Sequence, residues 1–117
     1  MHFYKIDNKA IASNDTLPYD ELFPNTSDGA GEKHVPVITI DANTVTVKVG
    51  STQHPMLDAH YITFIAIETV FNGLPSFQQK WLKPGMKPEV VFELSEGEQV
   101  IAAYEYCNLH GLWKAEA

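Results

Sequence analysis

The residues in this chain best suited to chemistry are its one cysteine and four of its five histidines. Cys107 lies three residues before His110, a spacing that allows a thiolate and an imidazole to bind the same metal ion. Three more histidines lie in short segments typical of turns or loops: His34, His54 and His60. Four imidazoles and one thiolate predict a single metal site, provided that the fold brings these segments together.

Each of these residues also has a simpler interpretation. A histidine in a β protein is more often a hydrogen-bonded surface or core residue than a metal ligand, and a lone cysteine can serve as a small buried apolar side chain. The sole cysteine and the four histidines all fall in loops or at the ends of predicted strands, where a rigid scaffold can direct side chains toward one point. This shared position favours a common site, while a chance arrangement stays open.

Alternation of apolar and polar residues predicts the all-β fold that must position this site. Valines alternate with polar residues over 44–49, as a half-buried strand requires. Apolar side chains of both parities over 61–71 predict a central strand covered on two faces, and Asn72-Gly73 then predicts a hairpin. Further strands are predicted at 37–40, 77–82, 89–94 and 100–106. This pattern favours an immunoglobulin-like antiparallel β-sandwich of about seven strands, with a β-barrel as the alternative.

Length and composition predict one acidic domain. A chain of 117 residues suits a single hydrophobic core. The net charge is −7 and the basic residues are scattered singly, so neither nucleic acid nor a membrane surface is an expected partner. The single cysteine excludes an intramolecular disulfide, and no signal sequence or run of about 20 apolar residues is present. We therefore expect a cytoplasmic protein.

The first 31 residues predict an arm and linker that precede the sandwich domain at 32–117. Segments 14–18 and 24–31 are rich in turn-forming residues and lack sustained alternation. Two short apolar stretches, Phe3-Tyr4 and Leu22-Phe23, could dock on the sandwich or on a second subunit.

Several motifs resemble, in order and spacing, the superoxide reductase family that includes desulfoferrodoxin and neelaredoxin. They are Glu32-Lys33-His34-Val35-Pro36, Gly50-Ser51-Thr52-Gln53-His54-Pro55-Met56, His60-Tyr61 and Cys107-Asn108-Leu109-His110-Gly111-Leu112-Trp113-Lys114. The resemblance runs from about Leu22 to the last residue. The immunoglobulin-like β-sandwich of this family agrees with the strands predicted above.

This resemblance implies a mononuclear non-haem iron site with one open coordination position. The implied ligands are four equatorial histidines and one axial thiolate, namely His34, His54, His60, His110 and Cys107. Imidazole and thiolate ligands suit iron, whereas structural zinc usually takes four ligands and blue copper takes two histidines, one cysteine and a weak axial ligand. The donor set therefore favours iron over zinc and copper.

The resemblance further implies the one-electron reduction of superoxide to hydrogen peroxide. Lys33 would attract the superoxide anion and order water for proton delivery, and Glu32 would occupy the open position in the oxidised state or help the product to leave. A solvated loop carboxylate is the alternative for Glu32. Two-iron desulfoferrodoxins carry four cysteines in an N-terminal module, and residues 1–31 contain none, so this segment would at most be a remnant of it.

Electrons would then come from an external carrier such as rubredoxin, and family members commonly form homodimers or homotetramers. Two other classes of protein stay open on the residues alone. One is a non-catalytic metal-binding electron-transfer β-sandwich protein, and the other is a cysteine-containing binding module without a metal.

Overall fold

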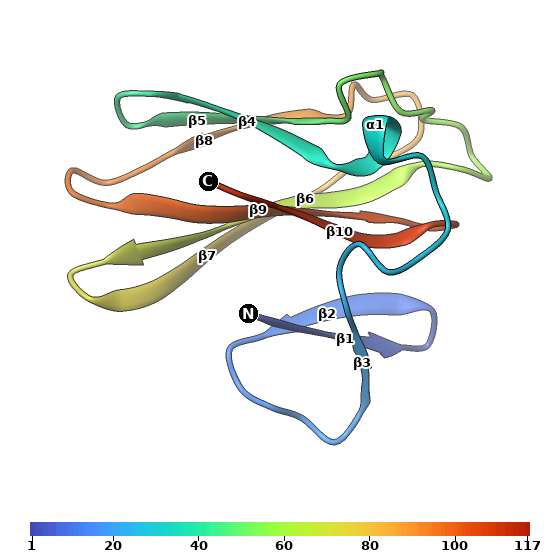
Figure 1. Cartoon of the computed structure of the whole chain (residues 1–117), viewed down its shortest axis with the longest axis horizontal. Coiled ribbons are helices and arrows are strands. Elements are labelled where there is room, and N and C mark those ends of the chain that lie inside the picture. The colour runs from blue at the N-terminus through green and yellow to red at the C-terminus, as the bar shows by residue number, and fades with distance from the viewer.

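The computed structural model describes residues 1–117 as ten β-strands and one short helix (Figure 1). In chain order these elements are β1 (His2–Ile6), β2 (Lys9–Ser13), β3 (Asp20–Leu22), α1 (Gly31–His34), β4 (Pro36–Asp41), β5 (Thr44–Val49), β6 (Ile62–Phe71), β7 (Leu74–Trp81), β8 (Glu89–Glu93), β9 (Gln99–Cys107) and β10 (Gly111–Glu116). None of this structure is a helix with the length and hydrophobicity that a membrane span requires.

Seven of the strands form an antiparallel sandwich of two sheets. One sheet has the strand order β10-β9-β6-β7, and the other has the order β4-β5-β8. Val45 and Val47 of β5 pack against Ile65 and Ile67 of β6 in the core between them. These valines are fully buried because they occupy one face of an alternating strand. The predicted all-β sandwich of about seven strands is confirmed.

The turns that connect the sandwich strands contain the predicted turn residues. One strand of the sandwich, β10, was not predicted from the sequence pattern. Asn72 and Gly73 both have positive φ angles, 52° and 74°, and join β6 to β7 in the tight antiparallel hairpin that this dipeptide favours. Strand β10 pairs with β9 directly after the turn that contains Cys107 and His110. Gly111 begins it at a φ of 82°, so glycine is needed there to reverse the chain.

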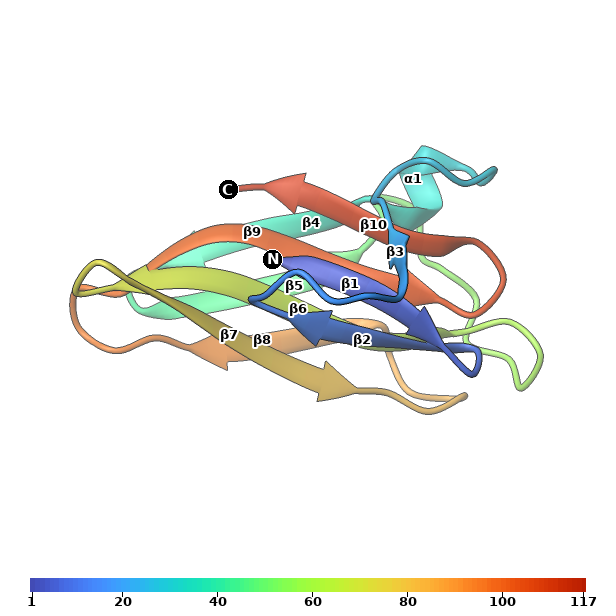
Figure 2. The same cartoon turned by 90° about the horizontal axis from the view of Figure 1, so that it is seen from below.

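The N-terminal segment contains a third sheet, which the sequence did not predict. Strands β1, β2 and β3 form it in the order β2-β1-β3. It lies on the face of the four-stranded sheet that points away from β4, β5 and β8 (Figures 1 and 2). These strands have only five, five and three residues, which is too short for a sustained alternating pattern. The division between arm and sandwich at residue 31 stays a prediction.

This third layer explains why apolar residues occur at both odd and even positions of β6. Phe3 is 1% exposed, and its ring lies 6.2 Å from that of Phe64 and 4.7 Å from that of Tyr104. Phe64 and Ala66 therefore face the N-terminal sheet, while Ile65 faces the sandwich core. The prediction of a central strand covered on both faces is confirmed.

Candidate metal centre

The four histidines and the cysteine come from connections at one end of the sandwich. His34 ends helix α1, His54 and His60 lie in the loop between β5 and β6, and Cys107 ends β9. His110 follows three residues later in the turn before β10. Figures 1 and 2 both place α1, the β5–β6 loop and the β9–β10 turn at the same end of the molecule. Residues up to 76 positions apart in the chain are thus brought together, His34 and His110 being the outermost.

The four imidazole rings form a closed circuit. Neighbouring ring centres are 4.6 Å apart for His34 and His54, 4.7 Å for His54 and His60, 5.2 Å for His60 and His110, and 5.0 Å for His110 and His34. An imidazole nitrogen lies about 2.1 Å from a bound metal and the ring centre about 1.1 Å further out, so four rings around one ion have neighbouring centres about 4.5 Å apart. The circuit therefore has the size of a four-nitrogen metal site.

The sulfur of Cys107 lies beside this circuit. It is 3.5 Å from Nε2 of His54, and the donor atoms of His34, His54 and Cys107 all lie within 4.8 Å of one another. His60 and His110 join the cluster through their ring contacts and lie outside this tightest group. Nε2 of His60 is buried without a hydrogen-bond partner, which fits a nitrogen that faces a metal ion.

Three of the four rings are oriented by a hydrogen bond at the other ring nitrogen, as is usual for histidines that bind metals. The partners are Glu105 Oε2 at 3.4 Å from His34 Nδ1, the Pro55 carbonyl at 2.6 Å from His54 Nδ1, and the Asp28 carbonyl at 2.8 Å from His110 Nδ1. Donation from Nδ1 of His54 to a carbonyl fixes the neutral tautomer. Its Nε2 lone pair is then free for a metal.

Burial favours the neutral, metal-binding form of three of the histidines, namely His34, His54 and His60. It is the main cause that lowers the pKa of His34 to about 4, followed by the positive charges of His54, His110, His60 and Lys33. Burial also lowers the pKa of His54 and of His60. These three imidazoles therefore do not have to lose a proton before they can coordinate an ion at neutral pH.

The surroundings of Cys107 have opposing effects on the pKa of its thiol. Burial raises its pKa, whereas hydrogen bonds from the backbone N–H groups of His110 and Leu109 lower it. These two N–H groups belong to the turn that follows the cysteine. A bound metal ion deprotonates a coordinating thiol outright, which would overcome the effect of burial.

Glu32 and Lys33 are exposed residues of α1, directly before His34. The carbonyl of Glu32 accepts a hydrogen bond from the backbone N–H of Thr52 at 2.9 Å, so the loop after β5 fixes this short helix. The charge of Lys33 is among the causes that lower the pKa of His34, His54 and His60. Its electrostatic field therefore reaches the cluster, whereas the Glu32 side chain makes no hydrogen bond or ion pair.

Comparison with known proteins connects this cluster to a family. A family model described as desulfoferrodoxin matches residues 26–116. The chain belongs to the desulfoferrodoxin family. The desulfoferrodoxin of Nitratidesulfovibrio vulgaris is 52% identical over 100 residues, which cover 86% of this chain and 75% of that protein. The superoxide reductase of Pyrococcus horikoshii is 32% identical over 105 residues, covering 78% of this chain and 90% of that one.

Solved structures agree with this membership. The crystal structure of the superoxide reductase from Treponema pallidum superposes with a TM-score of 0.77 at 35% identity, covering 97% of this chain and 84% of that one. Because nearly the whole chain is covered, the likeness extends to the N-terminal sheet. The predicted resemblance to the desulfoferrodoxin and superoxide reductase family is thus confirmed.

Two residues of this desulfoferrodoxin-family chain support His34 in a way that was not predicted from the sequence. The ring of Trp113 stacks on His34 with centres 4.9 Å apart and planes at 13°. Glu105 is fully buried in β9, and its Oε1 has no partner. Burial raises the pKa of this carboxyl well above its usual range. An acidic residue inside an apolar strand, on the same strand face as Cys107, was the available signal for Glu105.

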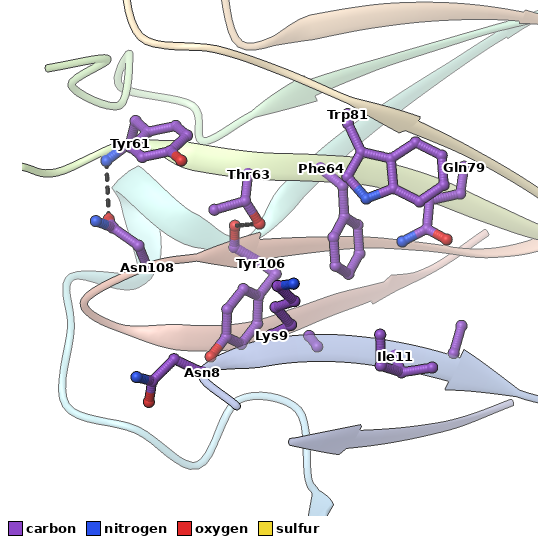
Figure 3. A pocket seen from close by; sticks show the side chains of 12 residues that line it. Asn8, Lys9, Ile11, Tyr61, Thr63, Phe64, Gln79, Trp81, Tyr106 and Asn108 are labelled. Atoms are coloured by element: carbon purple, nitrogen blue, oxygen red, sulfur yellow. Dashed lines mark hydrogen bonds between the residues drawn. The ribbon is translucent and has the colours of Figure 1, made fainter. Parts of the chain in front are cut away.

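A groove of this family member lies outside the cluster. It has a volume of about 540 Å³ and runs between β2 and the strands β6 and β7 (Figure 3). Aromatic residues including Phe64, Trp81 and Tyr106 line it. Tyr61 and Asn108, which follow His60 and Cys107 in the chain, also line it. None of the four histidines lines the groove, and neither does Cys107.

Proposed function

We propose that this chain is a superoxide reductase that transfers one electron to superoxide at a single iron ion. The observation that carries this proposal is the closed circuit of four imidazole rings with the Cys107 sulfur beside it. His34, His54, His60, His110 and Cys107 would hold the iron. Iron bound there would supply the electron that reduces superoxide.

The donor set supports iron over the other candidate metals. Five protein ligands exceed the four of a structural zinc site, and four histidines exceed the two of a blue-copper site. Family membership and the names of the superoxide reductases from Pyrococcus horikoshii and Treponema pallidum support superoxide as the substrate.

The exposure of the cluster supports a site that a small anion can enter. His34, His54 and Cys107 are at most 3% exposed, whereas His60 and His110 are partly exposed. The buried members would give the metal a rigid support, and the partly exposed rings would leave a path for superoxide. Superoxide has only two atoms, so the path can be narrow.

We assign electrostatic attraction of the substrate to Lys33. The chain carries a net charge of −7, so its overall field repels an anion. Distant surface carboxylates are screened beyond about 8 Å at physiological salt, whereas a cation beside the site is not. Lys33 has the placement to act in this way because its charge already influences three of the histidines.

Protons and electrons must both be supplied from outside the substrate. Each superoxide takes up one electron and two protons to become hydrogen peroxide, and no dioxygen is formed. Water ordered by Lys33 would deliver the protons, and Glu32 would occupy the open position of the oxidised iron or assist product release. The electron would come from a small carrier protein such as rubredoxin.

We further propose a cytoplasmic homo-oligomer, a dimer or a tetramer. The single cysteine is buried and unpaired, which suits a reducing compartment. The oligomer follows from the family resemblance alone, and sedimentation of the purified chain measures it directly.

Stopped-flow mixing with superoxide tests the proposed activity. The chain is loaded anaerobically with ferrous iron and mixed with superoxide, while the oxidation of the iron and the formation of peroxide are followed. We expect oxidation far faster than the spontaneous decay of superoxide, with one hydrogen peroxide per iron. Zinc-loaded protein is the matched control, because zinc does not change its oxidation state.

A different result would identify the alternative function. Slow oxidation by superoxide, together with fast electron exchange with a carrier protein, would contradict the reductase and support a non-catalytic electron-transfer protein. Evolution of dioxygen in place of stoichiometric peroxide would also contradict the proposal, because it would indicate dismutation.

A further inference from the structure

We propose that Asn108 is a positioning residue that holds His60 in the metal site. Its side chain would do so by tying both neighbours of His60 to the turn that begins at Cys107. This inference rests on the proposed metal site and adds a residue that the ligand set does not contain.

The side-chain amide of Asn108 makes two hydrogen bonds to the segment that contains His60. Oδ1 accepts one from the backbone N–H of Tyr61 at 2.9 Å, the bond drawn in Figure 3. Nδ2 donates the other to the carbonyl of Ala59 at 3.1 Å. Asparagine and glutamine are the side chains that present a donor pair and an acceptor on one planar group. The residues before and after His60 are thus both held by one side chain.

The backbone of Asn108 reinforces this link. Its N–H donates to the carbonyl of Tyr61 at 3.2 Å. Asn108 directly follows Cys107, and Tyr61 directly follows His60. The hydrogen bond therefore joins the chain neighbours of two proposed metal ligands. The distance between the sulfur and the His60 ring is therefore set by these three hydrogen bonds and not by the long chain path between the two residues.

His60 depends on such a backbone link more than the other three rings do. The rings of His34, His54 and His110 each have a hydrogen bond at Nδ1 that orients them. The His60 ring has no hydrogen bond to protein, and its buried Nε2 has no partner. Its orientation must come from its backbone, which pairs with Leu57 at 2.9 and 3.0 Å and is clamped on both sides by Asn108.

A general loop-stabilising role is the competing explanation, and the chain offers a matched control for it. Asn43 also links two loops through its side chain, donating from Nδ2 to Glu96 Oε2 at 3.0 Å. It lies in the turn between β4 and β5, at the opposite end of β4 from His34. Asn43→Ala removes a loop-to-loop hydrogen bond without touching the cluster.

The test is a Co²⁺ titration of the full-length chain, followed by the cysteine-to-cobalt absorption band and by the dissociation constant. Partners of metal-binding histidines typically contribute 10-fold to 100-fold to metal affinity. We expect Asn108→Ala to weaken Co²⁺ binding about 10-fold and to shift the band, while Asn43→Ala leaves both unchanged. The same Co²⁺ dissociation constant and the same band position in Asn108→Ala and Asn43→Ala would overturn the inference.

A double-mutant comparison tests whether Asn108 acts through His60. His60→Ala should weaken Co²⁺ binding by itself, and adding Asn108→Ala to it should cause little further loss. Full additivity of the two losses would contradict the proposed route. Asn108→Asp keeps the acceptor for Tyr61 and loses the donor to Ala59, so it should bind Co²⁺ with intermediate affinity. If Asn108→Ala does not fold, the Co²⁺ affinities of Asn108→Asp and Asn43→Asp are compared instead. Equal affinities would overturn the inference.

These outcomes are separate from those of the proposed function. Wild-type protein that gives no cysteine-to-cobalt band would remove the metal site itself. A normal wild-type band, weakened by His60→Ala and unaffected by Asn108→Ala, would remove only the role of Asn108.

Discussion

Gly50 offers the sharpest structural test of how the site is built, because its position leaves no room for a side chain. Gly50 follows β5 and has a φ of 77°. A Cβ placed there would lie 2.5 Å from the carbonyl oxygen of Thr52 and 2.7 Å from those of Glu32 and Lys33. All three are backbone atoms that cannot rotate away. The chain therefore has to move, and the short helix that carries His34 moves with it.

The size of the effect follows from comparison with Gly97, which has a similar φ angle and no such neighbours. Gly97 has a φ of 84°, and nothing lies within 4 Å of a Cβ built there. Gly97→Ala should cost only the strain of a left-handed residue, about 1–2 kcal/mol. Gly50→Ala adds the cost of overpacking, about 1–3 kcal/mol, for a total of about 2–5 kcal/mol. The entropy that alanine removes from the unfolded chain is common to both variants.

Urea unfolding of the metal-free variants measures this difference. We expect Gly50→Ala to have the lower midpoint, with a slope similar to that of Gly97→Ala. A Co²⁺ titration should show weaker binding in Gly50→Ala alone, because only this change displaces α1. Equal midpoints for the two variants would refute the claim that the 50–52 loop determines the position of His34.

Three other substitutions probe separate parts of the molecule. Lys33→Ala should slow the second-order reaction with superoxide about 10-fold at low salt while iron affinity is retained; Lys80→Ala is the control, and an unchanged rate would rule out the electrostatic role. Phe3→Ala should lower the unfolding free energy by about 3–5 kcal/mol without changing Co²⁺ affinity, because this buried ring packs on the sheet face away from the cluster. Leu74→Ala, at an exposed site, should change the unfolding free energy by at most about 0.5 kcal/mol. A loss in Leu74→Ala as large as that in Phe3→Ala would contradict the packing argument. Cys107→Ser should abolish the thiolate-to-iron absorption band in the iron-loaded chain; a band that persists would mean that the sulfur does not bind the metal.

Local patterns predicted the β-strands and the five residues of the candidate metal centre, and they left a β-barrel open as the alternative to the sandwich. Strands such as β5 alternate strictly, and Asn72-Gly73 has an intrinsic preference for one kind of hairpin turn. The cysteine and histidines were identified by residue type, because few other roles need five such side chains in loops. Their convergence into one circuit depends on tertiary structure; their positions in loops and at strand ends favoured a common site, and the family resemblance implied it.

Features that depend on contacts between distant segments were not predictable. The sequence left open whether Phe3 docks on the sandwich or on a second subunit, and in the structure Phe3 and its neighbours cover a second apolar face of β6. The sheet that these residues form was not predicted, because its strands are too short to show sustained alternation. Trp113 and Glu105 support His34 from β10 and β9, across separations of 79 and 71 residues. Asn108 acts through hydrogen bonds to a loop that lies 47 and 49 residues earlier in the chain.

Iron K-edge X-ray absorption of the iron-loaded chain counts the atoms bound to the metal, and so decides whether the four histidines and Cys107 bind one iron ion. We expect a single iron per chain with one sulfur and four imidazole nitrogens as neighbours, and loss of the sulfur in Cys107→Ser. An iron shell of oxygen and nitrogen alone in the wild-type chain would contradict this expectation.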